Sequence, residues 1–260
     1  MSLSPKIAIG RQLRHCPSVH CLRTHGNLSD YTEQELELIR QAPKIYFPTI
    51  LMAEALSAIG KPIFPSIQTI RYAGDKIRQT QLFQLLGLPM PRTRIYYGPR
   101  QKNSILDDFS FPLVAKVPRN SSKGRGVSLI RNQDELDRYT CLPHPAYIQE
   151  YLPIRRDIRI VILGGKPVHA YWRESCEGEF RTNISQGGKV VLEPVPDKAL
   201  ELAVQTAVKC RFDLVALDIC VYSDQVYLLE ANMTFGMDGF KAAGLDFRAM
   251  LRDMVENGDL

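Results

Sequence analysis

The chain has 260 residues, of which 45% are hydrophobic and 23% charged, as in an ordinary globular protein with a substantial core. Its net charge of +5 is too small to indicate nucleic-acid binding, although it suits an anionic ligand. No stretch approaches the roughly 20 consecutive apolar residues of a membrane helix. The N-terminus lacks a secretory signal pattern, so we expect a cytoplasmic protein without a membrane partner.

Short strands and helices alternate in the first third of the chain. The pattern predicts three strands and two helices, at 6–10, 44–49 and 61–66 and at 32–42 and 51–60 respectively. Thr32, followed by Glu35, forms a capping-box pattern at the start of the first helix. Such alternation is typical of a mostly parallel sheet.

Five residues that can bind metals lie close together in the segment HCPSVHCLRTH. They are His15, Cys16, His20, Cys21 and His25. Their spacing matches no standard zinc pattern, so a polar loop and strand at the surface is the favoured interpretation. The six cysteines of the chain show no disulfide-framework spacing, and we read them as reduced thiols.

Further helices and strands are predicted from residue 75 onward. A helix at 75–87 has Leu82, Leu85 and Leu86 as its apolar face. Further strands are predicted towards 98, at 111–118, at 146–153 and in hairpins at 157–175 and 214–232, with helices at 133–140, 196–211 and 245–258. The first of these hairpins is expected to turn at Gly164-Gly165.

The last hairpin, LVALDICVYSDQVYLLEANM, carries two carboxylates in apolar strands. If the turn centres on Asp224, Asp218 and Glu230 face each other directly, with Asn232 on the same face and Ala216 opposite it. Leu229 is expected to point the other way. Carboxylate and amide oxygens suit Mg²⁺ or Mn²⁺, so the three side chains predict a metal site.

A second set of residues suggests phosphate binding. Lys116 ends the apolar strand LVAK, where a lysine can reach into a cleft as a point charge. The following loop, SSKGRGV, offers backbone N–H groups together with Lys123. Together with an acidic metal site, this loop indicates a nucleoside triphosphate held between a basic lid and a metal platform.

The ordered set DK, LVAK, SSKGRGV, IQEYL, DIR, FRTN, ALDI and LLEANMTFG resembles the ATP-grasp superfamily, and most of all its RimK-like branch of α-L-glutamate ligases. The likeness runs from about Lys44 to the C-terminus. It implies a fold of the α+β or α/β class, with an ATP-grasp domain at 75–260. A small, shortened α/β domain of the pre-ATP-grasp type would precede it at 1–74. A lid at about 108–147 and a metal-binding part at about 148–260 would divide the larger unit.

The resemblance also implies roles for individual residues. The phosphates of ATP would be contacted by Lys76, Lys116 and the lid loop with Lys123, and the adenine by Gln149, Glu150, Tyr151 and Leu152. Asp157 would lie near the ribose, and Arg173, Arg181 and Asn183 near the triphosphate and the reacting acyl group. Asp218, Glu230 and Asn232 would hold Mg²⁺ or Mn²⁺.

The implied activity is an ATP-dependent carboxylate–amine ligase that works through an acylphosphate. The carboxylate and the amine stay unidentified: an amino acid, a peptide or a protein C-terminus are all open, as is a homo-oligomer. One departure from the family concerns the acceptor side, because the loop RQLRHCPSVHC stands where a helix is expected after the first strand. A small-molecule kinase and a non-catalytic nucleotide-binding protein are the alternatives.

Overall fold

A computed structural model describes residues 5–119, 126–176, 182 and 187–260 of the chain. The N-terminal sheet is fully parallel in the order β2-β1-β3-β4, as the alternation predicts. Its strands are β1 (Lys6–Ile9), β2 (Val19–Leu22), β3 (Ile45–Tyr46) and β4 (Ile63–Phe64). No helix separates β1 from β2, which confirms the unusual loop at this point.

Two helices, α1 (Glu33–Gln41) and α2 (Ile50–Ala58), cover one face of this sheet, with the 3₁₀ turn η1 (Leu28–Asp30) before them. The capping box of α1 is confirmed, because Glu35 N–H donates to Thr32 Oγ1 at 3.2 Å and Thr32 N–H donates to Glu35 Oε2 at 2.8 Å. Both orphan donors at the helix start are thereby satisfied.

The helices α3 (Ile67–Arg71) and α4 (Lys76–Leu85) lead into the rest of the chain. The predicted apolar face of α4 is confirmed for Leu82 and Leu86, which pack against the core of the large sheet, but it is wrong for Leu85, which is 86% exposed. Gln79 and Thr80 of the same helix are buried. Gln79 Nε2 donates to Ala231 O at 2.8 Å, and Ala231 N–H donates to Gln79 Oε1 at 3.2 Å. Polar side chains face inward here because they satisfy the backbone of an edge strand.

The second sheet is antiparallel and has the order β5-β8-β6-β7. Its strands are β5 (Thr93–Tyr96), β6 (Leu113–Lys116), β7 (Val127–Ile130) and β8 (Ala146–Glu150). The short helices α5 (Gly98–Lys102) and α6 (Ile105–Asp108) and the helix α7 (Gln133–Thr140) accompany it, and α6 and α7 pack on its buried side through Ile105, Leu136 and Tyr139. The strands of this sheet lie between residues 93 and 150 and include the expected lid segment, so we call it the lid sheet.

The largest sheet has the order β11-β10-β9-β12-β13 and is antiparallel. Its strands are β9 (Arg156–Leu163), β10 (Lys166–Glu174), β11 (Lys189–Val191), β12 (Leu214–Tyr222) and β13 (Gln225–Asn232). The β9–β10 hairpin turns at Gly164 and Gly165, both with positive φ, as predicted. Helix α8 (Asp197–Cys210) packs against one face of the sheet, through Leu202 and Ala203 among others.

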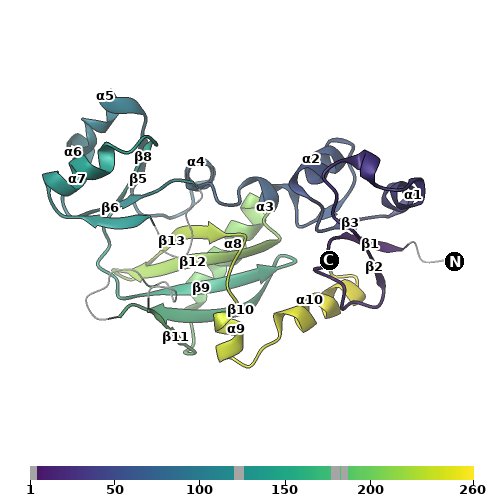
Figure 1. Ribbon diagram of the computed structural model, residues 1–260. Coiled ribbons are helices and arrows are strands. Elements are labelled where there is room, and N and C mark those ends of the chain that lie inside the picture. The colour runs from purple at the N-terminus through teal and green to yellow at the C-terminus, as the bar shows by residue number, and fades with distance from the viewer. Residues whose placement is uncertain (1–4, 120–125, 177–181, 183–186) are drawn as a thin grey trace.

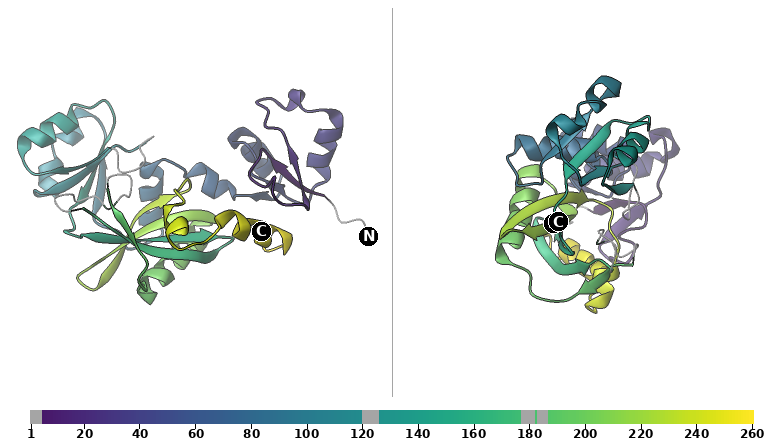
Figure 2. Two further views of the ribbon diagram at one scale, coloured as in Figure 1. Left: turned by 60° about the horizontal axis from the view of Figure 1, so that its bottom comes forward. Right: turned by 90° about the vertical axis from the view of Figure 1, so that its left-hand side faces the viewer.

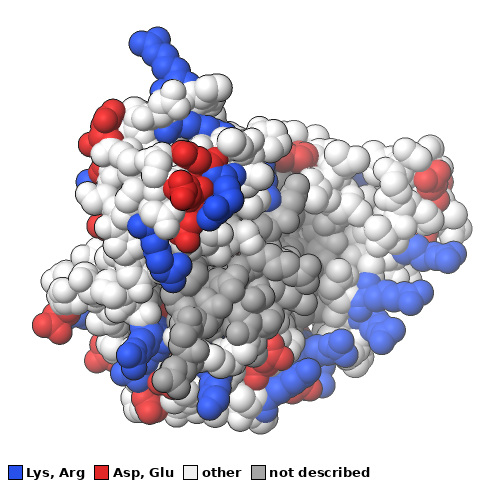
Figure 3. Space-filling view, turned by 60° about the vertical axis from the view of Figure 1, so that its left-hand side comes forward, with Lys and Arg blue, Asp and Glu red and all other residues white. Residues whose placement is uncertain are grey.

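The lid sheet and the N-terminal sheet lie at opposite ends of the large sheet (Figures 1 and 2). The chain ends with α9 (Asp238–Ala242) and α10 (Phe247–Glu256), and α10 returns to the N-terminal sheet. There Leu251 and Val255 pack with Ala8, Leu13 and Cys16. The face of the molecule in Figure 3 carries Lys and Arg side chains along its lower and right-hand margin, in keeping with the net charge of +5.

Among the described residues, no helix is both long and apolar enough to cross a membrane. The His and Cys residues of the 15–25 segment lie in different surroundings: Cys16 is buried in the core, and the His25 ring packs edge-on against Tyr31. His15 Nε2 lies 3.0 Å from Arg248 O. In the part of the chain that the structure describes, no three His, Cys, Asp or Glu side chains are grouped so that they could hold a metal ion.

Candidate active site

The β12–β13 hairpin sets the geometry of the site. Asp218 lies opposite Glu230 and Ala216 opposite Asn232, which confirms the predicted register. The turn consists of Ser223 and Asp224, both with positive φ, and on its own it would pair the strands one residue differently. A β-bulge between Asp218 and Ile219 restores the register by adding one residue to β13.

The bulge also changes the direction of one side chain. The predicted alternation directs Leu229 away from Glu230, but Leu229 and Glu230 line the same cavity. Leu228 and Ala231, on either side of them, both belong to the core beneath α8. The inserted residue is the physical reason, because it breaks the alternation of the strand at this point. The site thereby gains an apolar surface beside a carboxylate.

Asp218 is buried and surrounded by cationic donors. Arg159 donates to both of its carboxylate oxygens, through Nε and Nη2, at 2.8 Å each. Arg173 Nη2 lies 2.9 Å from Oδ2, and Asn232 Nδ2 donates to the same oxygen at 3.1 Å. Burial on its own raises the pKa of Asp218, but the charges of Arg159 and Arg173 outweigh it and lower that pKa. Asp218 is therefore an anion at neutral pH.

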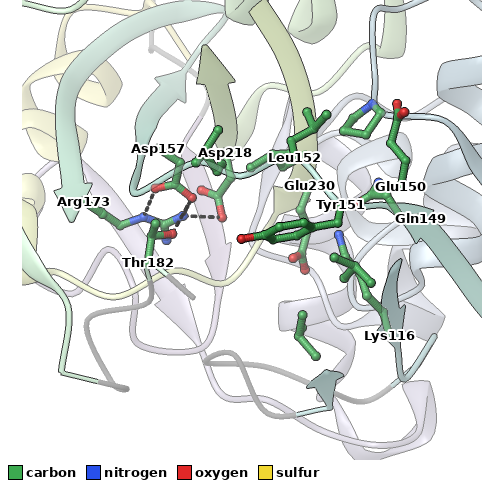
Figure 4. A pocket seen from close by; sticks show the side chains of 15 residues that line it. Lys116, Gln149, Glu150, Tyr151, Leu152, Asp157, Arg173, Thr182, Asp218 and Glu230 are labelled. Atoms are coloured by element: carbon green, nitrogen blue, oxygen red, sulfur yellow. Dashed lines mark hydrogen bonds and ion pairs between the residues drawn. The ribbon is translucent and has the colours of Figure 1, made fainter. Parts of the chain in front are cut away.

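Arg173 is fixed from its other side by Asp157. Arg173 Nε and Nη2 donate to the two oxygens of Asp157 at 2.8 and 2.6 Å, and Thr182 Oγ1 donates to Asp157 Oδ2 at 2.7 Å. Figure 4 shows Asp157, Arg173, Thr182 and Asp218 as one group at one end of the cavity. Together with Arg159, which binds Asp218, the group contains two arginines and two aspartates in alternation, so its charges cancel.

Two residues of this group were missed as site residues by the sequence analysis. Arg159 belongs to the quoted DIR motif, and it lies opposite Asp218 in the β9–β12 ladder. Thr182 belongs to the FRTN motif and is buried. The available signal for Arg159 was a cation in the middle of the apolar run DIRIVIL, which is as costly as a carboxylate unless it is paired.

Glu230 is paired with a lysine from a different element. Lys76 Nζ, in the first turn of α4, lies 3.1 Å from Glu230 Oε1. The Lys76 side chain is buried. The Glu230 side chain is 26% exposed and that of Asp218 is 6% exposed, so Glu230 is the more accessible of the two facing carboxylates. Opposed carboxylates repel unless cations separate them, and the protein provides a different cation for each one.

Lys116 enters the same cavity from the lid sheet. Its side chain is buried, and its Nζ lies 5.8 Å from the centroid of the Tyr147 ring. Burial lowers the pKa of Lys116 to about 8, against the opposing attraction of Glu230. A lysine desolvated in this way gains stability when an anion binds to it.

The cavity between the lid sheet and the large sheet combines these charges with an apolar surface. Its volume is about 110 Å³. The apolar lining comes from both sheets and the segment between them: Pro91, Val114, Val127, Leu152, Ile154 and Leu229. Figure 4 shows the Tyr151 ring among the charged groups, with Lys116 and Glu230 on one side of the cavity. The cavity therefore presents an apolar surface next to cationic groups that attract a polyanion.

Most of the predicted site residues come together here. Nine of them line this one cavity: Lys116, Gln149, Glu150, Tyr151, Leu152, Asp157, Arg173, Asp218 and Glu230. Lys76 and Asn232 bind its carboxylates. The Gln149 side chain is committed elsewhere, because Nε2 donates to Thr93 Oγ1 at 2.9 Å. Lys123, Arg181 and Asn183 lie outside the described residues.

Comparison with known families supports the sequence interpretation. The family model described as a RimK-like ATP-grasp domain matches residues 73–255. A probable alpha-L-glutamate ligase of Parasynechococcus marenigrum (strain WH8102) is 27% identical over 239 residues, which are 89% of this chain and 51% of that protein. The ribosomal protein bS6--L-glutamate ligase of Escherichia fergusonii is 28% identical over 203 residues, 75% and 67% of the two chains. The chain thus spans about half to two thirds of these relatives.

Solved structures share the fold. A RimK domain protein of Sphaerobacter thermophilus superposes with a TM-score of 0.66 at 15% identity, over 96% of this chain and 99% of that one. The ATP-grasp ligase PsnB gives 0.68 at 17% identity, over 95% and 97%. D-alanine--D-alanine ligase from Bacillus anthracis gives 0.69 at 15% identity, over 96% of each chain. These similarities confirm the predicted ATP-grasp fold with its mixture of helices and sheets.

Proposed function

Because the chain belongs to the RimK-like ATP-grasp domain family, we propose that it is an ATP-dependent carboxylate–amine ligase. The relatives described above are named glutamate ligases, and an enzyme of the ATP-grasp family uses ATP. The observation that carries the proposal is the cavity between the two sheets. Lys116 and Glu230 line it, Lys76 binds Glu230, and the Asp157–Arg173–Asp218–Arg159 group lies beside them.

The proposed reaction has two steps. A carboxylate oxygen of the first substrate attacks the γ-phosphorus of ATP, the bond between that phosphorus and the bridging oxygen breaks, and ADP leaves. The amine nitrogen of the second substrate then attacks the acyl carbon of the acylphosphate. Inorganic phosphate leaves, and the nitrogen loses a proton to give the amide. An acylphosphate hydrolyses readily, so water has to be kept away from it.

The residues divide this work between them. Lys76 and Lys116 bind the phosphates as point charges. Arg173, whose Nη2 binds both Asp157 and Asp218, is held in a fixed position from which its guanidinium would donate to the negative charge that develops on the phosphoryl group. The chain leaves the lid sheet after Glu150, so the backbone of Tyr151 and Leu152 becomes available to the edge of the adenine.

The donor set fits a magnesium or manganese ion. Asn232 donates to Asp218 through Nδ2, which leaves its Oδ1 as an acceptor, and Glu230 is the more accessible carboxylate. Together with Asp218 these residues would hold Mg²⁺ through hard oxygen ligands. When bound, the ion neutralises charge on the phosphates of ATP.

The names of the relatives suggest the first substrate to test. We propose L-glutamate as the amino-acid substrate, with a peptide or a protein terminus as its partner. The test is to incubate the protein with Mg-ATP, glutamate or pooled amino acids, and pooled carboxylates, and to follow ADP release together with new masses. Coupled appearance of ADP, phosphate and a condensed product supports a ligase. A phosphorylated product without free phosphate would select a kinase instead.

A further inference from the structure

A second cavity, of about 1100 Å³, lies where the N-terminal domain meets the end of the chain. Its walls come from the loop after β1, from Phe47 after β3, and from α9 and α10. The residues at its base are apolar: Leu214, Phe240, Phe247 and Leu251. The loop is the one that replaces the expected helix in this chain, and no residue of this cavity has a role in the reaction proposed above.

The rim of this cavity is strongly basic. Arg11 and Arg14 reach it from the loop, Lys241 from α9 and Arg248 from α10. All four are exposed, and within the described residues none of them forms an ion pair. Among the described residues of the lining, Asp246 is the one carboxylate. It is the N-cap of α10, and its Oδ1 accepts the N–H groups of Arg248 and Ala249 at 2.8 and 3.2 Å.

Charge and shape together define what fits here. Four cations face one carboxylate that is already engaged, so the cavity attracts anions. Its volume exceeds that of most small-molecule pockets, and its aromatic and aliphatic base favours an occupant with apolar groups. Both properties favour an acidic polypeptide segment over a nucleic acid.

The position of the cavity relates it to the site between the sheets. Leu214, Ala216 and Asp218 lie on one face of β12, since side chains alternate along a strand. Leu214 lines the basic cavity and Asp218 lines the other one. Four residues of extended strand span about 13 Å, which separates the two sites by that distance along the sheet.

That spacing is longer than a single amino acid and matches about four residues of extended peptide. We propose that the basic cavity binds an acidic segment of a polypeptide substrate, about four residues from the group that reacts beside Asp218 and Glu230. The proposal rests on the ligase function proposed above. It assigns the recognition of the polypeptide substrate to Arg11, Arg14, Lys241 and Arg248.

The test measures binding without ATP, so that it does not depend on turnover. Fluorescence anisotropy of fluorescein-labelled hexaglutamate and of hexaglutamine would be compared on the full chain. We expect hexaglutamate to bind at least about ten-fold more tightly, with an affinity that falls as salt rises. Equal affinity for the two peptides would overturn the proposal.

Variants on the two sides of the cavity locate the binding site. Arg14→Glu and Arg248→Glu should each weaken hexaglutamate binding at least about ten-fold, whereas Arg138→Glu, an exposed change on α7, should not. Arg248 lies in the first turn of α10, where a glutamate favours the helix, so this variant is expected to fold. Unchanged binding by Arg14→Glu and Arg248→Glu, or equal competition by a single-stranded oligonucleotide, would remove the assignment.

The same variants separate this inference from the ligase proposal. If the enzyme ligates peptides, the KM for an acidic peptide should rise about ten-fold in Arg248→Glu while the kcat stays unchanged. Ligase activity with no change in that KM would contradict the basic cavity alone. If the wild type binds hexaglutamate and Arg248→Glu does not, but the wild type never releases ADP, the result contradicts the ligase proposal alone.

Discussion

Asp218 and Glu230 face each other across the β12–β13 ladder, yet their charges are neutralised from opposite directions. Asp218 is buried against Arg159 and Arg173 of the large sheet, whereas Glu230 turns to Lys76 at the start of α4. One carboxylate is therefore fixed by its own sheet, and the other lies at the boundary between elements. We expect substitutions of the two to have different consequences.

Replacing Glu230 by glutamine should remove activity without unfolding the protein. The change keeps the shape of the side chain but deletes the charge that Lys76 and a divalent ion would share. We expect ADP formation to fall by about 100-fold or more while the Tm stays close to that of the wild type. Glu201→Gln, on the exposed surface of α8, is the matched control. Full turnover by Glu230→Gln would exclude this carboxylate from the reaction.

Replacing Asp157 by alanine should lower stability as well as activity. The substitution leaves Arg173 and Arg159 with a single carboxylate between them, and removing one partner of a buried ion pair costs about 3–5 kcal/mol. Urea unfolding measures the loss, with Asp107→Ala on the exposed surface as the control. An Asp157 that only contacts the ribose of ATP would instead raise the KM for ATP and leave the free energy of unfolding unchanged.

The local part of this site could be predicted from the sequence, because it depends on a short hairpin. An assumed turn centre at Asp224 and the alternation of side chains along a strand limit the register, and on that basis Asp218 and Glu230 are predicted to face each other, as they do. The bulge at Leu229 was missed, since an inserted residue leaves no mark in an apolar run. The bulge adds one residue to β13, and the resulting register is the one that a turn centred on Asp224 would give.

The long-range part could not be predicted. Arg159 is 59 residues from Asp218 in the chain, and their pairing depends on β12 lying beside β9 in the sheet. The prediction for the inward face of α4 was incomplete for the same reason. Leucine spacing predicted an apolar face, but the edge of β13 needs hydrogen bonds, and Gln79 supplies them.

The pKa of Lys116 predicts a pH dependence of ATP use. Burial lowers that pKa to about 8, and only the protonated ammonium attracts phosphate. We expect kcat/KM for ATP to fall about ten-fold per pH unit above pH 8, since this ratio reports the free enzyme. Lys116→Arg keeps its charge and should move this fall to higher pH. A profile that is the same in both proteins would assign the titration to another group.

The same titration should act on folding with the opposite sign. Between pH 8 and about 10.4 the unfolded chain holds a proton on Lys116 that the folded protein has lost, so the stability contribution rises with pH. Below pH 8 the buried ammonium is a cost in the folded state. The free energy of unfolding of the wild type, relative to Lys116→Met, should therefore increase from pH 7 to pH 10 in urea titrations.

Gly239 connects α9 to the active-site face of the large sheet. A Cβ atom at this position would lie 2.1 Å from Tyr171 Cε1, and Tyr171 pairs with Arg159 in the β9–β10 ladder. The ring is buried and cannot move aside without displacing α9 or the strand. Gly239→Ala should therefore lower the free energy of unfolding by about 2 kcal/mol, as overpacking of a core does.

The effect of this substitution should reach the reaction through Arg159. A displaced Tyr171 shifts the guanidinium that holds Asp218, and we expect kcat to fall about ten-fold with little change in the KM for ATP. Gly26→Ala is the control, because a Cβ atom there meets nothing within 4 Å and its backbone needs no positive φ. If Gly239→Ala is as stable and as active as Gly26→Ala, α9 does not support the active-site face through this contact.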